Sequence, residues 1–88
     1  MKKRSRLEMY FDILKTVKRG VRKPTRIMYR TNLSWIPLMK ILDSFVSEGL
    51  LITSTKKTHR FYELTEKGET VLQNLSRALE WERRIQIE

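Results

Sequence analysis

Pro37 limits the fold of this chain more than any other single residue. It lies inside RIMYRTNLSWIPLMKILDSF, residues 26–45, a stretch that is rich in apolar residues and contains no glycine. A proline in the interior of a continuous helix costs about 3 kcal/mol, whereas in the first turn its missing N–H costs little. We therefore predict two helices, over residues 26–30 and 35–48, with a corner at residues 31–33.

Capping residues predict where these two helices begin and end. Thr25 and Ser34 each precede a helix, where a hydroxyl oxygen accepts a hydrogen bond from a free N–H of the first turn. Gly49 follows the second helix at the position where glycine commonly ends helices. The stripe that this second helix is expected to bury consists of Leu38, Ile41, Leu42, Phe45 and Val46.

The start of the chain predicts another helix and then a short extended segment. Ser5 and Glu8 have the spacing of a capping box, which places the helix start directly after the serine. Gly20 is expected to end this helix. Residues 21–23 are expected to be extended, because Pro24 disfavours helical backbone in the residue before it.

The second half of the chain predicts a β-hairpin and a long last helix. The runs LLITST and RFYEL are rich in β-forming residues and flank KKTH, so the hairpin has a basic tip. Helix resumes at Thr65 and continues through Trp81, Ile85 and Ile87. If the core is complete before these three apolar residues, they form a strip of the kind that marks an interface. The alternative is that the helix folds back over the first helix and closes the core.

Positive charge is concentrated near the start of the chain. The formal net charge is +9, from 19 Lys or Arg and 10 Asp or Glu. Residues 1–30 contain eleven of the basic and two of the acidic residues, whereas residues 61–88 carry a small negative charge. Charge that is segregated in this way indicates a polyanionic partner.

The composition argues against several classes of function. With no cysteine and a single histidine, the chain has no thiolate or histidine set for a metal, and we expect no metal, no cofactor and no small-molecule ligand. No nucleophile–base set is present either, so we predict that it is not an enzyme. No apolar run is long enough for a membrane span, and MKKRSR leads into an amphipathic segment instead of a signal-peptide core. A cytoplasmic, nucleoid-associated location is therefore expected.

The predicted order of elements is that of a winged helix-turn-helix. The expected fold class is α+β, mostly α, with three helices, a β-hairpin wing and an extended C-terminal helix. In this motif the helix after the corner enters the major groove of DNA and the hairpin reaches the backbone or the minor groove. We divide the chain into a basic arm (1–5), a DNA-binding domain (6–75) and a dimerisation segment (76–88).

Four sequence motifs carry a family resemblance over residues 5–75. Together, SRLEMYFDIL, TRIMYRTNLSW, GLL and YELTEKG resemble the small basic winged-helix proteins of archaea, which include DNA-binding regulators and chromatin-like proteins. The resemblance implies sequence-related binding of double-stranded DNA by a homodimer whose last helices pair as an antiparallel coiled coil. This chain departs from the family at Ile36, Pro37 and Met39, where members carry polar or basic residues, and these side chains cannot hydrogen-bond base edges.

The candidate sites follow from this arrangement. The predicted DNA contacts are Arg22, Lys23, Arg26, Arg30, Ser34, Trp35, Ile36, Met39, Lys40, Lys56, Lys57 and Arg60. The predicted dimer interface is Leu75, Ala78, Leu79, Trp81 and Ile85. For Trp35, a packing role is the alternative to a DNA contact, and Tyr29 and Tyr62 are interpreted as packing residues as well.

Three other functions compete with a dimeric transcriptional regulator. One is a nucleoid protein that coats DNA with little sequence preference, which the apolar start of the third helix favours. Another is a protein-interaction module that uses the same apolar surface to bind a partner. RNA binding is the third.

Overall fold

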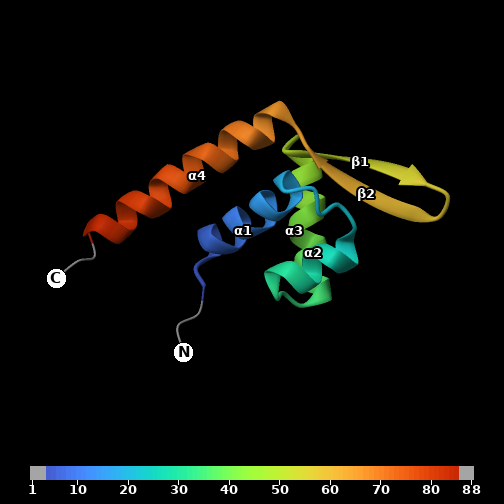
Figure 1. Cartoon of the computed structure of the whole chain (residues 1–88), viewed down its shortest axis with the longest axis horizontal. Coiled ribbons are helices and arrows are strands. Elements are labelled where there is room, and N and C mark those ends of the chain that lie inside the picture. Colours follow the sequence, from blue (N-terminus) through green and yellow to red (C-terminus); the bar gives the residue numbers. More distant parts are fainter. Residues whose placement is uncertain (1–3, 86–88) are drawn as a thin grey trace.

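The computed structural model describes residues 4–85, which form four helices and one β-hairpin (Figure 1). In chain order the elements are α1 (Arg6–Lys18), α2 (Pro24–Thr31), α3 (Trp35–Ser47), β1 (Leu51–Lys56), β2 (His59–Leu64) and α4 (Glu66–Ile85). The predicted fold class and the order of a winged helix-turn-helix are confirmed. Ile87 and the first lysines of the predicted arm lie outside the described residues.

One apolar core joins all six elements except the tip of the hairpin and the end of α4. Its buried members are Ile13, Leu14, Val17, Ile27, Leu38, Leu42, Phe45, Leu50, Leu51, Tyr62 and Leu72. The stripe expected on α3 is confirmed in its centre, where Leu38, Leu42 and Phe45 are buried. Every helix therefore contributes apolar side chains to the same core.

The start of α1 has the predicted capping box. The Ser5 hydroxyl accepts a hydrogen bond from the Glu8 N–H at 3.1 Å, and the Glu8 carboxylate accepts one from the Ser5 N–H at 2.8 Å. The helix ends at Lys18, and Gly20 then takes a φ of 99°, which glycine adopts without strain. Both predicted ends of this helix are confirmed within two residues.

The predicted cap at Thr25 is wrong, because α2 begins at Pro24, two residues before the predicted start. Pro24 is the first helical residue, where its fixed φ suits the helix and its missing N–H is not needed. Lys23 is the cap residue and makes no side-chain capping bond. Ser34 does precede α3, but its side chain makes no capping bond either.

The corner between α2 and α3 lies at the predicted position. Asn32 turns the chain with a left-handed φ of 58°, which asparagine tolerates better than most residues. The hydroxyl of buried Thr31 donates to the Ile27 carbonyl at 2.7 Å, so burial leaves this group satisfied. Pro37 then lies in the first turn of α3, as its chemistry requires.

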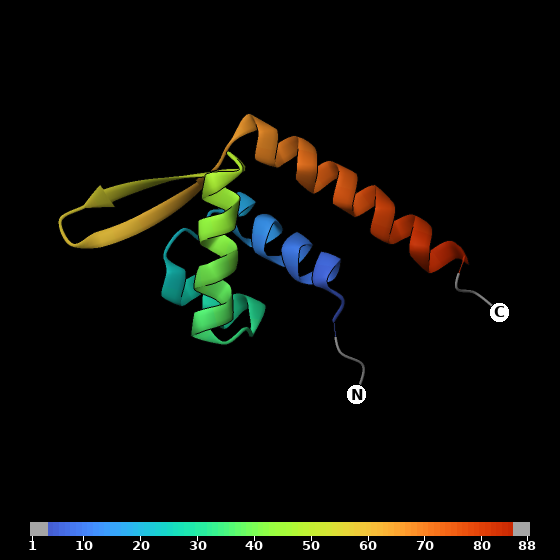
Figure 2. The ribbon, with the colours of Figure 1, turned by 180° about the vertical axis from the view of Figure 1, so that it is seen from behind.

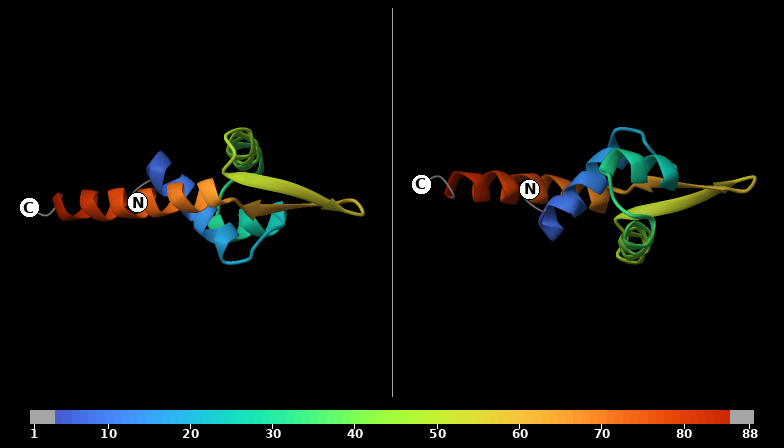
Figure 3. Two further views of the ribbon diagram at one scale, coloured as in Figure 1. Left: turned by 90° about the horizontal axis from the view of Figure 1, so that it is seen from above. Right: turned by 90° about the horizontal axis from the view of Figure 1, so that it is seen from below.

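The hairpin extends from the body as an antiparallel pair with a turn at Lys57 and Thr58 (Figures 1 and 3). The Tyr62 N–H donates to the Arg22 carbonyl at 3.0 Å, so the extended segment before α2 lies beside β2. This confirms the extended backbone predicted for residues 21–23. The segment thus connects the base of the hairpin to the start of α2.

Helix α4 returns alongside α1 and ends beyond it (Figures 1 and 2). The Thr65 hydroxyl accepts a hydrogen bond from the Gly68 N–H at 2.9 Å and donates to the Gly49 carbonyl at 2.6 Å. This hydroxyl both caps α4 and ties it to the end of α3. Residues of the second half of α4, from Ala78 onward, are mostly exposed.

Candidate nucleic-acid interface

The two faces of the hairpin have different environments. Tyr62 and Leu51 lie on the inner face and are buried in the core. Side chains alternate along a strand, so Ser54, Lys56 and Phe61 lie on the opposite, outer face. Basic residues of the hairpin are therefore divided between two surfaces.

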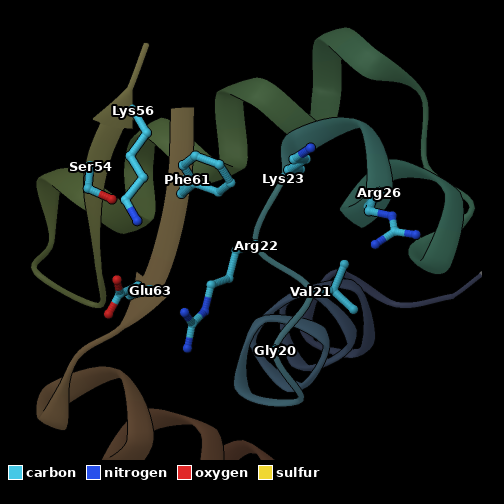
Figure 4. Close-up of a pocket in the computed structure, with 9 residues that line it drawn as sticks. All are labelled: Gly20, Val21, Arg22, Lys23, Arg26, Ser54, Lys56, Phe61 and Glu63. Atoms are coloured by element: carbon cyan, nitrogen blue, oxygen red, sulfur yellow. The ribbon is translucent and has the colours of Figure 1, made fainter. Parts of the chain in front are cut away.

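A pocket of about 310 Å³ lies between the outer face of the hairpin and the segment that leads into α2 (Figure 4). We call it the basic pocket. Its lining residues are Gly20, Val21, Arg22, Lys23, Arg26, Ser54, Lys56, Phe61 and Glu63. It brings together four of the predicted DNA contacts, from segments more than 25 residues apart in the chain.

The basic pocket has four cationic residues, Arg22, Lys23, Arg26 and Lys56. Within residues 4–85, none of the four forms an ion pair. Glu63 is the only carboxylate that lines the pocket. The pocket therefore carries a formal excess of positive charge and is suited to an anion.

Arg60 lies on the inner face of the hairpin, apart from the basic pocket. The adjacent Tyr62 hydroxyl, followed by the Asp43 carboxylate on α3, raises the pKa of Arg60, so this guanidinium stays charged. The Tyr62 hydroxyl is buried beside Arg60 and makes no other hydrogen bond within the described chain. Arg60 thus faces α3.

The start of α3 has an apolar exposed surface. Ile36 is 67% exposed and Trp35 43% exposed, whereas Met39 is half-buried and packs against the core. Met39 therefore has less free surface for a partner than Ile36, because the core covers part of its side chain. Ile36 remains the most accessible apolar residue of this turn.

Lys40 lies on α3, away from the basic pocket. It lines a mostly apolar groove of about 390 Å³ between α1, α3 and α4. The other lining residues are Tyr10, Leu14, Ile41, Ser44, Phe45, Glu48, Leu50, Val71 and Leu75. Lys40 is exposed and lines this groove, whereas no residue of α3 lines the basic pocket.

Tyr29 was predicted to pack, and this is wrong, since 80% of the residue is exposed. It lies on α2 beside Arg26 and Arg30, which share a small pocket with it. Helical spacing places Tyr29 away from the buried Ile27, on the exposed side of α2. In a helix of 8 residues this periodicity is only a weak indication of burial. Tyr62, in contrast, is fully buried as predicted.

The end of α4 presents an apolar strip, formed by Ala78, Trp81 and Ile85. These residues recur at spacings of three and four, so they lie on one side of the helix. Trp81 is 63% exposed and Ile85 56% exposed. Leu79 is instead buried within its own chain.

Two further features of the described chain bear on its class. No helix in residues 4–85 has the length and apolar character needed to cross a membrane. The same residues hold no cluster of His, Asp and Glu with the size of a metal site.

The corner, the third helix and the hairpin define a winged helix-turn-helix domain. A family model described as winged helix-turn-helix matches residues 3–83, and the chain belongs to this family. The predicted resemblance is thereby confirmed, and membership in this family of binding domains also establishes that the chain is not an enzyme.

Two uncharacterized proteins of Methanocaldococcus jannaschii are similar in sequence. MJ0287 is 40% identical over 73 residues, which cover 83% of this chain and 71% of that protein. MJ0290 is 37% identical over 73 residues, but the match covers only 33% of its length. The chain is therefore similar to nearly three quarters of one relative and to one third of the other.

Two solved structures from Sulfolobus solfataricus share the fold. Sso10a-2, a DNA-binding protein, superposes with a TM-score of 0.84 and 26% identity, covering 93% of this chain and 85% of that one. The transcriptional regulator BldR superposes with a TM-score of 0.74 and 22% identity, covering 91% and 62%. The neighbours of this fold are DNA-binding and transcription-regulating proteins.

Proposed function

We propose that this protein binds double-stranded DNA as a homodimer and regulates transcription. The observation that carries the proposal is the similarity to Sso10a-2, a DNA-binding protein whose structure superposes on 93% of this chain. The concentration of positive charge in residues 1–30 supports it independently. A cytoplasmic, nucleoid-associated location is part of the same proposal.

In this proposal α3 lies in the major groove and cationic side chains hold the phosphates. Ser34, Trp35, Ile36 and Lys40 lie at or near the exposed start of α3. Lys56 and Lys57 flank the tip of the hairpin, and Arg26 and Arg30 are exposed on α2. Phosphate contacts from these residues would position the protein without reading sequence.

A second candidate function, nonspecific coating of DNA, is favoured by the surface of α3. Ile36 is well exposed but can only touch thymine methyl groups, and Pro37 offers no hydrogen-bonding side chain. Lys40 and Asp43 are the nearest exposed charged residues on the same helix. Base-specific contacts would therefore be few, and affinity would depend on phosphates.

The homodimer is supported by apolar surface that the single chain leaves uncovered. Leu75 lines the groove between α1, α3 and α4, and the strip of Ala78, Trp81 and Ile85 follows it along α4. A second α4 placed on this surface would cover both. Twofold symmetry is the commonest arrangement of oligomers and suits two DNA half-sites.

Fluorescence anisotropy on two duplexes across a salt series tests this function. One duplex has a random sequence and the other is the promoter of the protein's own gene. An affinity gap of about 10³ or more indicates a specific regulator, whereas equal, steeply salt-dependent affinities indicate nonspecific coating. Absence of binding to both duplexes at low salt would contradict DNA binding and favour the protein-interaction module.

A matched pair of variants assigns the contribution of the hairpin tip. Replacing Lys56 and Lys57 with alanine is expected to reduce the salt slope by about 2, because each phosphate contact contributes roughly one unit. Replacing Arg77 and Arg83 with alanine removes the same charge from the exposed surface of α4. Equal losses in the two variants would mean that net charge, and not the wing, governs binding.

A further inference from the structure

The basic pocket is a concave site on one side of the hairpin, and it shares Arg26 and Lys56 with the proposed phosphate contacts. Arg60 and Asp43 mark the side of the hairpin that faces α3, whereas the basic pocket opens on the other side. Its walls come from the hairpin, from residues 20–23 and from the first turn of α2 (Figure 4). A concave site of this kind is suited to a small ligand.

The charges of the basic pocket indicate an anionic ligand. Four cations and the single carboxylate of Glu63 line the pocket, and none of the four cations forms an ion pair within the described chain. The first turn of α2 also contains no acidic residue, and its cap residue Lys23 makes no capping bond. The start of α2 therefore adds no negative charge to the pocket.

An aromatic wall and the size of the pocket narrow the class of anion. Phe61 lines the pocket, with the Lys23 ammonium 6.0 Å from the centre of its ring. Aromatic rings stack on nucleobases and cations bind phosphates. A volume of about 310 Å³ exceeds the need of a single phosphate ion and lies within the range of small-ligand sites.

We propose that the basic pocket binds a nucleoside phosphate. The phosphates lie among Arg22, Lys23 and Arg26, and the base lies against Phe61. Since these cations are also proposed DNA contacts, an occupied pocket weakens binding to DNA. This last step rests on the proposed function, whereas binding of the nucleotide itself does not.

Isothermal titration of the full chain with ATP, in EDTA and at about 0.15 M salt, tests the site directly. We expect saturable binding of one ATP per chain. Arg22→Ala should weaken it about tenfold or more, because a charge-assisted hydrogen bond is lost, while Arg77→Ala should leave it unchanged. Binding that does not saturate, or equal losses in the two variants, would overturn the proposal.

Inorganic triphosphate as a second probe separates recognition of the base from recognition of the phosphates. Phe61→Leu keeps an apolar side chain of similar size, and circular dichroism confirms that the variant is folded. It should weaken ATP severalfold and leave triphosphate unaffected. If Phe61→Leu leaves ATP binding unchanged, or weakens both probes equally, the ligand is not recognised through its base.

The effect on DNA is measured by repeating the anisotropy titration with ATP at constant ionic strength. ATP should raise the apparent Kd for the random duplex in the wild type and not in Arg22→Ala. If ATP binds but the protein does not bind DNA, only the proposed function fails. If DNA binds and ATP does not, only the inference fails.

Discussion

The two halves of α4 share one amphipathic pattern but lie in different surroundings. In the first half, Gly68 and Leu72 are buried against the body of the protein. In the second half, Trp81 and Ile85 are exposed, and Leu79 alone is buried. Periodicity therefore predicts which side of a helix is apolar, while neighbouring elements decide how much of that side is covered.

The largest loss of folding stability is expected from a substitution where the first half of α4 packs most closely against the rest of the protein. A Cβ at Gly68 would lie 2.2 Å from the Leu50 carbonyl oxygen and 2.7 Å from a Leu64 methyl group. Gly68→Ala should therefore lower the free energy of unfolding by about 3 kcal/mol or more, since backbone must move. Urea denaturation at a fixed protein concentration measures this free energy of unfolding.

The control for Gly68→Ala is Ser76→Ala, on the exposed side of the same helix. It should change stability by less than about 0.5 kcal/mol. If Gly68→Ala is equally mild, α4 does not pack on Leu50 and Leu64 as closely as the structure places it. The distinction between a covered and an uncovered half would then disappear.

Substitutions in the second half of α4 should weaken the association of two chains and leave folding unchanged. Trp81→Glu places a charge on the proposed interface and should weaken the dimer by about 2 kcal/mol or more, which is about 30-fold in its dissociation constant. Analytical ultracentrifugation measures this constant. The secondary structure by circular dichroism should be unchanged, because Trp81 is largely exposed in the single chain.

Gln73→Glu is the matched control for Trp81→Glu, with the same new charge on an exposed position of the first half. It should leave the dimer intact. A wild-type protein that is monomeric at all concentrations would refute the dimer, and the strip at Trp81 would then need another partner.

The fold could be predicted from the sequence because its decisive signals are local. Pro37 excluded a continuous helix, and the pair Ser5 and Glu8 identified the first capping box. Thr25 failed as a cap because the adjacent Pro24 is itself well suited to the first helical position. Each of these outcomes depends on the chemistry of neighbouring residues.

The candidate site was harder to predict because it depends on distant segments. The sequence identified Arg22, Lys23, Arg26 and Lys56 as basic, but not that they line one cavity with Phe61. Strand alternation alone does not tell which hairpin face meets the start of α2. That assignment follows from Tyr62, whose burial fixes the inner face and turns Phe61 outward.

A smaller effect is expected at the start of the covered half. Thr65→Ala removes a hydroxyl that accepts from the Gly68 N–H and donates to the Gly49 carbonyl, and should cost about 1 kcal/mol. Ser34→Ala is the comparison, because that cap residue makes no side-chain capping bond. Thermal and urea unfolding should rank the two variants. Equal losses would contradict this assignment of the caps.

The smallest effect is expected from the ion pair that joins α1 to the covered half. The Lys18 Nζ atom lies 2.6 Å from the Glu69 Oε1 atom. The two side chains are 51% and 32% exposed, so solvent screens much of their attraction. In a double-mutant cycle of Lys18→Met and Glu69→Gln, the coupling should be about 0.5 kcal/mol at low salt and vanish near 1 M. The pair Glu80 and Arg84 lies within the second half, one helical turn apart and more exposed. A double-mutant cycle of Glu80 and Arg84 should give a smaller coupling free energy, because this pair joins no second element. A coupling larger than that of Lys18 and Glu69 would contradict the expected order.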